Sequence, residues 1–188
     1  SGKNKVNGQM SYLYEDYAAL DFRKNYYSFN SKESFIKDFY TDKPGLKIQN
    51  YQINHIDDLT KPVEFICEAE TKDNIDNLGE EIFIYPLLYE RTMENPFKLD
   101  ERKYPVDLAY QTEKTVIINL TLQDNMEFVE LPEPVLVQLP DNGGSFSFKY
   151  KVNGNKLNIN YSRQINKIVF PVDEYQYLQE LWNQIVNI

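Results

Sequence analysis

The pattern that decides the fold lies at residues 146–161, which read FSFKYKVNGNKLNINY. Apolar and polar side chains alternate on both sides of Asn153-Gly154, which predicts two β-strands with one face buried. An Asn-Gly pair between two such runs is the strongest short-range indication of a β-hairpin. We therefore predict an antiparallel hairpin here, with the side chains of Phe146, Phe148 and Tyr150 directed towards the core.

The same two-residue period recurs through much of the chain, at residues 63–69, 116–122 and 135–139, and residues 165–170 predict one more strand. Residues 82–87 carry apolar side chains in both phases, which predicts a central strand. The pattern gives roughly nine to eleven strands, too many for one open sheet of this length. We predict a mainly β protein, or an α+β protein with few helices. Its expected architecture is an antiparallel two-sheet β-sandwich of jelly-roll type.

Two segments show helical spacing instead, and we predict peripheral helices at about residues 31–42 and 173–187. In the first, Asn30 is the expected cap, Glu33 completes a capping box, and Phe35 and Phe39 lie on one apolar stripe. In the second, apolar residues recur on one face between residues 175 and 185. Residues 10–20 are rich in aromatics and predict a strand that continues to Tyr27, while residues 90–104 predict a long loop.

Length and composition limit the range of functions. A chain of 188 residues suits one domain or two very small ones. We expect a single β-sandwich domain over residues 1–188 that is a fragment of a larger protein. We expect residues 1–8 to be a tag remnant, either disordered or a linker. The formal charge of −9 disfavours nucleic acid and anionic membrane surfaces as partners. No apolar run reaches the length needed to span a bilayer.

The chain has one cysteine, Cys67, and one histidine, His55. A hydrolase that uses a cysteine nucleophile and a histidine base is therefore one interpretation. Cys67 is in phase with the apolar face of its strand, so we expect a buried thiol with a raised pKa and no reactivity. A zinc site needs several His or Cys ligands. The acidic segment at residues 73–81 lacks the EF-hand pattern and reads as a solvated loop. We therefore predict no catalytic, cofactor-binding or metal-binding residues, and a stand-alone enzyme is the disfavoured alternative.

A further set of residues resembles a known family. Residues 95–98 read NPFK and residues 101–107 read ERKYPVD, and weaker matches follow at residues 131–132, 139–140, 164–167 and 171–178. This combination resembles the C-terminal region of bacterial transglutaminase-like proteins, which are exported multidomain proteins of Gram-negative bacteria. Their order is an N-terminal β domain, a papain-like transglutaminase core and a C-terminal β domain of unknown function. The resemblance is clearest from about Asn95 onward.

The resemblance implies a non-catalytic accessory or interaction domain. In that family the catalytic Cys, His and Asp lie in the core, with Cys before His, whereas here His55 precedes Cys67. No catalytic residue is therefore transferred to this chain. The implied partner is the transglutaminase-like core of the same polypeptide, with another protein or a glycan as a further partner. Export implies the periplasm or the outer cell surface as the location.

The residues that carry the resemblance are also the candidate interdomain contact: Asn95, Phe97, Arg102, Tyr104 and Asp107. If this segment faces another domain, Phe97 or Tyr104 should be exposed in this chain. The simpler alternative is an ion pair between Arg102 and Asp107 that pins the loop.

An alternative function is a carbohydrate-binding module, which needs two or three exposed, coplanar aromatic rings. The candidates by number are Tyr12, Tyr14, Tyr17, Tyr26 and Tyr27.

Overall fold

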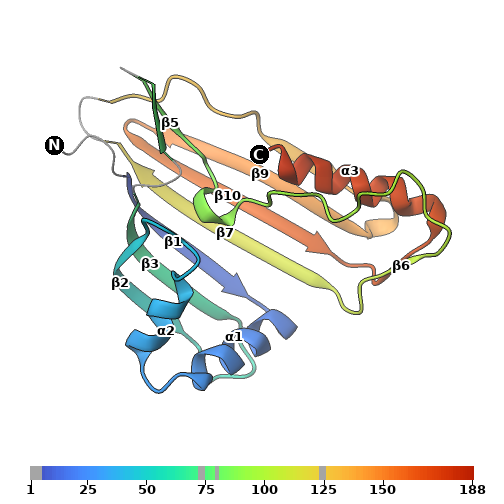
Figure 1. Ribbon diagram of the computed structural model, residues 1–188, viewed down its shortest axis with the longest axis horizontal. Helices are drawn as coiled ribbons and strands as arrows, with labels where there is room; N and C mark the ends of the chain where they lie inside the picture. The colour runs from blue at the N-terminus through green and yellow to red at the C-terminus, as the bar shows by residue number, and fades with distance from the viewer. Residues whose placement is uncertain (1–5, 72–74, 79–80, 123–125) are drawn as a thin grey trace.

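One antiparallel sheet of seven strands is the framework of the molecule (Figure 1). The computed structural model describes residues 6–71, 75–78, 81–122 and 126–188. The strand order is β2-β3-β1-β7-β10-β9-β8, so β7 is central and β2 and β8 are the edges. The strands are β1 (Val6–Tyr14), β2 (Lys47–Asn54), β3 (Val63–Thr71), β7 (Thr112–Thr121), β8 (Val135–Gln138), β9 (Gly144–Asn153) and β10 (Lys156–Ile165).

The hairpin predicted from residues 146–161 is confirmed. β9 and β10 pair in one register from Asn153 opposite Lys156 to Gly144 opposite Ile165. Gly154 takes a φ of 59° at the turn, a conformation that glycine adopts without the steric cost of a Cβ atom. β10 then pairs with β7, which pairs with β1, so the hairpin leads directly into the middle of the sheet.

Four short strands form two separate ribbons. β4 (Ile75–Leu78) pairs with β5 (Glu81–Ile84), and β6 (Val106–Asp107) pairs with β11 (Val169–Phe170). The central strand predicted at residues 82–87 is therefore wrong, because β5 pairs only with β4 among the described residues. Pro86 cannot donate to a strand ladder, and Leu87 and Leu88 are buried beyond it at the start of a short 3-10 helix.

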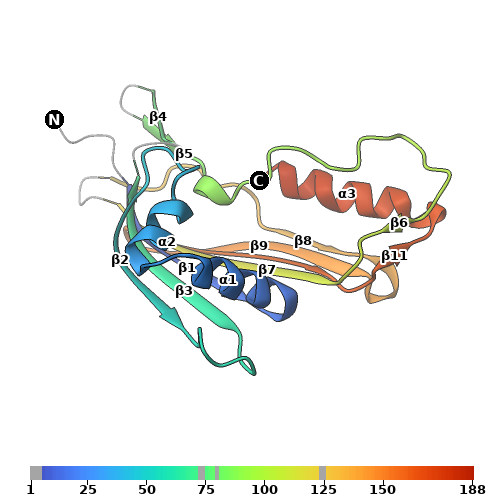
Figure 2. The same cartoon turned by 60° about the horizontal axis from the view of Figure 1, so that its bottom comes forward.

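Three helices cover one face of the sheet: α1 (Asp16–Ser28), α2 (Lys32–Phe39) and α3 (Tyr175–Val186). Three 3-10 helices accompany them, η1 (Leu88–Glu90), η2 (Pro140–Asn142) and η3 (Val172–Glu174). Figure 2 shows α3 lying over β8 and β9. At the other end of the sheet, Phe22 of α1 and Phe35 of α2 pack against Phe65 of β3.

The predicted mainly β fold with few helices is confirmed, whereas the two-sheet sandwich of jelly-roll type is not. The described strands form no second large sheet opposite the first. A sheet with one apolar face needs only one covering layer, and amphipathic helices provide that layer here. The helices expected at about residues 31–42 and 173–187 are confirmed as α2 and α3, although Ser31 rather than Asn30 caps α2.

The strand predicted from residue 10 to Tyr27 is correct only for its first part. β1 ends at Tyr14 and α1 begins at Asp16. The buried residues of α1 are Ala19, Phe22 and Arg23, which have helical spacing that the aromatic content of the segment obscured. Residues 1–5 lie outside the described part of the chain, while residues 6–8, predicted as part of a terminal linker, belong to β1.

The pairing register gives the sheet a packed face and an open face. The packed face carries the core, including Phe65 and Cys67 of β3, Ile118 of β7 and Phe148 of β9, each at most 1% exposed. The open face carries the alternate residues, which are mostly polar. Among the described residues no helix packs against it. The open face includes Glu64, Ile66, Glu68 and Glu70 of β3, Asn7, Gln9, Ser11 and Leu13 of β1, Glu113, Thr115, Ile117 and Asn119 of β7, Asn158, Asn160 and Ser162 of β10, and Ser147, Lys149 and Lys151 of β9.

Candidate interaction surface

The long loop predicted at residues 90–104 is fastened to α3, and we call residues 91–105 the strap. Asn95 makes the first attachment, because its Nδ2 donates to the carbonyl oxygen of Gln179 (2.9 Å) and to Oδ1 of Asn183 (2.7 Å). Its Oδ1 accepts from the backbone N–H of Phe97 (2.8 Å). In return, Nε2 of Gln179 donates to the carbonyl oxygens of Phe97 (2.8 Å) and Leu99 (3.0 Å).

Aromatic packing completes this attachment. The Phe97 ring is 8% exposed, and its centroid lies 6.1 Å from the rings of both Tyr175 and Trp182 on α3. The guanidinium of Arg102 lies over the Tyr175 ring, with its carbon 5.6 Å from the ring centroid. Three of the five predicted contact residues, Asn95, Phe97 and Arg102, therefore hold the strap to α3.

The expected ion pair between Arg102 and Asp107 does not form among the described residues. Arg102 lies against Tyr175, while Oδ1 of Asp107 accepts from the backbone N–H of Ala109 (2.9 Å). Asp107 is the last residue of β6 and pairs with Val169 of β11. The loop is thus held by α3 and β11 and needs no ion pair.

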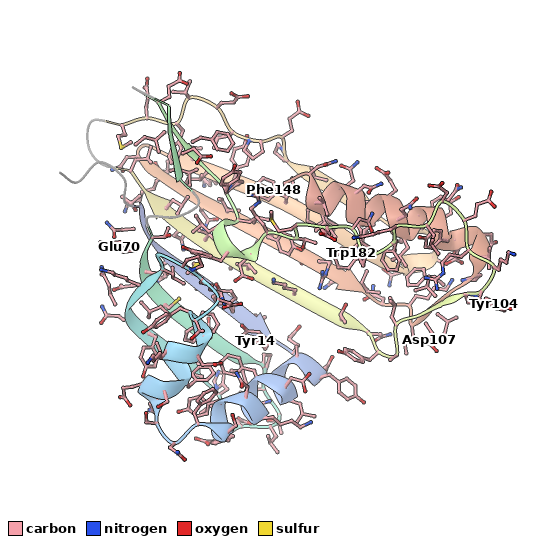
Figure 3. All side chains as sticks on the ribbon, viewed as in Figure 1. Tyr14, Glu70, Tyr104, Asp107, Phe148 and Trp182 are labelled. Atoms are coloured by element: carbon pink, nitrogen blue, oxygen red, sulfur yellow. The ribbon has the colours of Figure 1, made fainter. Side chains whose placement is uncertain are left out.

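Tyr104 is 77% exposed, so the condition set for an interdomain contact, that Phe97 or Tyr104 be exposed, is met. Figure 3 shows Tyr104 and Asp107 near the end of the molecule that is farthest from the N-terminus. Three further apolar side chains on the β11 segment are exposed: Ile168 (40%), Val169 (45%) and Val172 (42%). We call Tyr104, Ile168, Val169 and Val172 the distal patch.

Two sets of polar contacts inside the fold, made by Glu90 and by Arg23, were not predicted from the sequence. Tyr12 of β1 donates its hydroxyl to Oε1 of Glu90 (3.0 Å), and Nζ of Lys114 on β7 lies 2.7 Å from Oε2 of Glu90. Burial, and then the Glu90 carboxylate, raise the pKa of Tyr12 well above its usual value. Buried Arg23 donates through Nε to the carbonyl oxygen of Ile56 (3.1 Å). Its Nη2 lies 2.7 to 3.0 Å from three more carbonyl oxygens in the β2–β3 loop.

The lone thiol and the lone imidazole are far apart. Cys67 is 1% exposed, and burial raises the pKa of its thiol to about 12. It pairs with Tyr51, four residues before His55, which corresponds to roughly 13 Å along the strand. His55 is at the start of the β2–β3 loop. The geometry therefore does not assemble a Cys–His nucleophile.

The tyrosines proposed for sugar binding do not form a platform in the described structure. Tyr12 is buried at 4% exposure, and only Tyr17 and Tyr27 of the five are exposed. The Tyr27 ring meets Tyr26 edge-on at 78°, and Tyr17 is tilted by 38° against Tyr110. Flat sugar rings stack on coplanar aromatic faces, which this arrangement does not offer.

The described residues also offer no large pocket and no metal site. An apolar recess between β1, β3 and β7 has space for about one water molecule. No group of three His, Cys, Asp or Glu side chains is placed to hold a metal ion within the described part of the chain. The acidic segment at residues 73–81 lies partly outside the described residues. No helix among those described has the length and apolarity that crossing a lipid bilayer requires.

One family model matches the chain, over residues 80–188, and it is described as a "Domain of Unknown Function with solved-structure structure" (DUF3858). No curated protein and no solved structure matches the chain. The family match covers more than half of the 188 residues and includes the strap, the β6–β11 ribbon, the hairpin and α3. The chain therefore belongs to the DUF3858 family of domains of unknown function.

Proposed function

We propose that the chain is a non-catalytic accessory domain that binds another folded domain through its distal patch. The observation that carries this proposal is the position of Tyr104. The strap before it is fastened to α3, and Val106 after it is buried in the β6–β11 ribbon, yet Tyr104 itself is 77% exposed. A large amphipathic ring held at a fixed place on the surface loses little conformational freedom on binding. Tyrosines of this kind are enriched among the residues that dominate interface energies.

The sequence resemblance suggests which domain this is. The segment that contains Asn95, Phe97, Arg102, Tyr104 and Asp107 resembles the C-terminal region of exported transglutaminase-like proteins. We infer from it that the partner is a transglutaminase-like core in the same polypeptide, and that both act in the periplasm or at the outer surface. Interfaces between domains of one chain are modest in area, which fits a patch of four exposed side chains.

Titration calorimetry tests this proposal, with the 188-residue chain titrated against the flanking folded domain of its parent polypeptide, produced separately. We expect binding that Tyr104→Ser weakens at least tenfold, because removing a central interface tyrosine commonly costs about 2 kcal/mol. Tyr177→Ser is the matched control, since Tyr177 on α3 is 53% exposed but lies outside the distal patch. Equal weakening by both substitutions, or no binding at all, would refute the proposal.

A further inference from the structure

The open face of the sheet carries opposite charges on its two sides. Glu64 and Glu68 lie on β3, two strands to one side of β7, whereas Lys149 and Lys151 lie on β9, two strands to the other. Neighbouring strands are about 4.8 Å apart, so about 19 Å separates the two groups. The acids and the lysines are therefore too far apart to pair within one chain.

Neither group is neutralised by other described residues. Glu68 accepts a hydrogen bond from Nδ2 of Asn50 (2.8 Å) and Glu64 accepts one from Nδ2 of Asn54 (2.7 Å), and both donors are uncharged. Lys149 and Lys151 are exposed and form no ion pair with a described residue. The open face thus presents unpaired negative charge at one side and unpaired positive charge at the other.

The pairing register places these charges at matching heights along the strands. Glu68 pairs with Gln9, Gln9 with Asn119, Asn119 with Asn158, and Asn158 with Lys151. One row of five residues therefore crosses the face from an acid, through three amides, to a base. Lys149 lies one row further, between the rows that contain Glu68 and Glu64.

We propose that the open face is the interface of a two-fold symmetric homodimer whose axis runs along β7. A half-turn about a line parallel to the central strand turns the sheet over and exchanges its two sides, but keeps each residue at its height along the strands. β3 of one copy then faces β9 of the other, and Glu68 faces Lys151 of the second copy. The Glu68–Lys151 contact forms twice in the dimer, and Lys149 lies opposite the space between Glu64 and Glu68 of the second copy.

The size and composition of the face fit this use. The five strands from β3 to β9 have nine or ten residues each and cover about 24 by 30 Å, roughly 700 Å² per copy, close to the about 800 Å² per partner of a standard interface. The centre holds the side chain of Ile117 and the amides of Asn119 and Asn158, which can donate and accept hydrogen bonds across the interface. Glu113, at the far end of β7, would meet its own copy, so we expect the closest contact near Ile117 and Asn119.

Sedimentation equilibrium of the 188-residue chain at 0.05 and 0.5 M NaCl tests the dimer. We expect a dimer that the higher salt weakens, because exposed charge pairs are screened. Lys151→Glu and Glu68→Lys should each raise the dissociation constant about tenfold or more, since each places two like-charge contacts in the interface. The double variant should return the constant to within about threefold of the wild-type value.

The rescue is the decisive comparison, because about 19 Å separates Glu68 from Lys151 within one chain and only contact between copies explains it. Lys24→Glu, on the outer surface of α1, makes the same charge change away from the open face and should leave the constant unchanged. Circular dichroism shows that each variant is folded. A monomer at all concentrations, a dimer unaffected by the single substitutions, or a double variant without rescue would overturn the proposal. The distal patch is untouched by these variants, so this result is independent of the proposed interdomain contact.

Discussion

Replacing Phe97 with alanine tests whether the strap is an integral part of the fold. The ring is 8% exposed and contacts the rings of Tyr175 and Trp182, both at 6.1 Å between centroids. Burial of a phenylalanine contributes about 3–5 kcal/mol in a rigid core, and a surface strap can partly collapse into the space left by the ring. We therefore expect Phe97→Ala to lower the free energy of unfolding by about 3 kcal/mol, a large part of the total for a domain of this size.

Urea unfolding followed by fluorescence and by circular dichroism measures this loss. Trp182 is the only tryptophan and lies against Phe97, so its fluorescence reports the contact directly. Leu99→Ala is the matched control on the same strap, because Leu99 is 59% exposed and should change stability by less than about 0.5 kcal/mol. A loss below about 1 kcal/mol for Phe97→Ala, with coincident transitions by both signals, would refute the role of this contact.

Three further predictions concern single residues, Arg23, Cys67 and Gly154. Arg23→Lys should lower the unfolding free energy by about 2 kcal/mol or more in urea titrations, because one ammonium group cannot reach the four carbonyl oxygens that the guanidinium serves; an unchanged midpoint would contradict this. Burial raises the pKa of Cys67 from 9.0 to about 12, so the unfolded chain releases this proton first as the pH rises, and between pH 9 and 12 this group alone should lower the free energy of unfolding by about 1.4 kcal/mol per pH unit, in addition to the loss from the buried tyrosines. Cys67→Ala should remove the Cys67 contribution and so make the alkaline slope less steep, and equal slopes for the two proteins would count against it. Gly154→Ala should cost about 1 kcal/mol in thermal or urea unfolding, because alanine is strained at a φ of 59°, and a neutral result would show that the turn relaxes.

The proposed homodimer and the proposed interdomain contact use different surfaces. The distal patch lies on the strap and the β11 segment, whereas the open face is the side of the sheet away from the helices. One chain can therefore use both at once. A two-fold dimer of such domains would present two distal patches, one from each copy.

Local sequence patterns predicted the elements whose spacing is regular. The alternation at residues 116–122 and 146–161 gave β7 and the β9–β10 hairpin, and the apolar stripe at residues 175–185 gave α3. The buried state of Cys67 also followed from its phase within β3. The prediction was wrong for residues 16–28, which form α1, because this segment has few apolar residues and its aromatic content favoured a strand.

The sequence by itself determined that this chain is rich in antiparallel strands, that Cys67 is buried in them, and that residues 90–104 form a long loop. Only the tertiary structure decided that the seven main strands lie in one sheet, that helices form the second layer, and that Asn95 and Phe97 face α3 while Tyr104 faces solvent. The physical reason is range. Alternation of side chains between adjacent residues is a local property, whereas strand order and the partner of a loop depend on contacts between residues far apart in the chain, such as Met10 with Ile118 and Phe97 with Gln179.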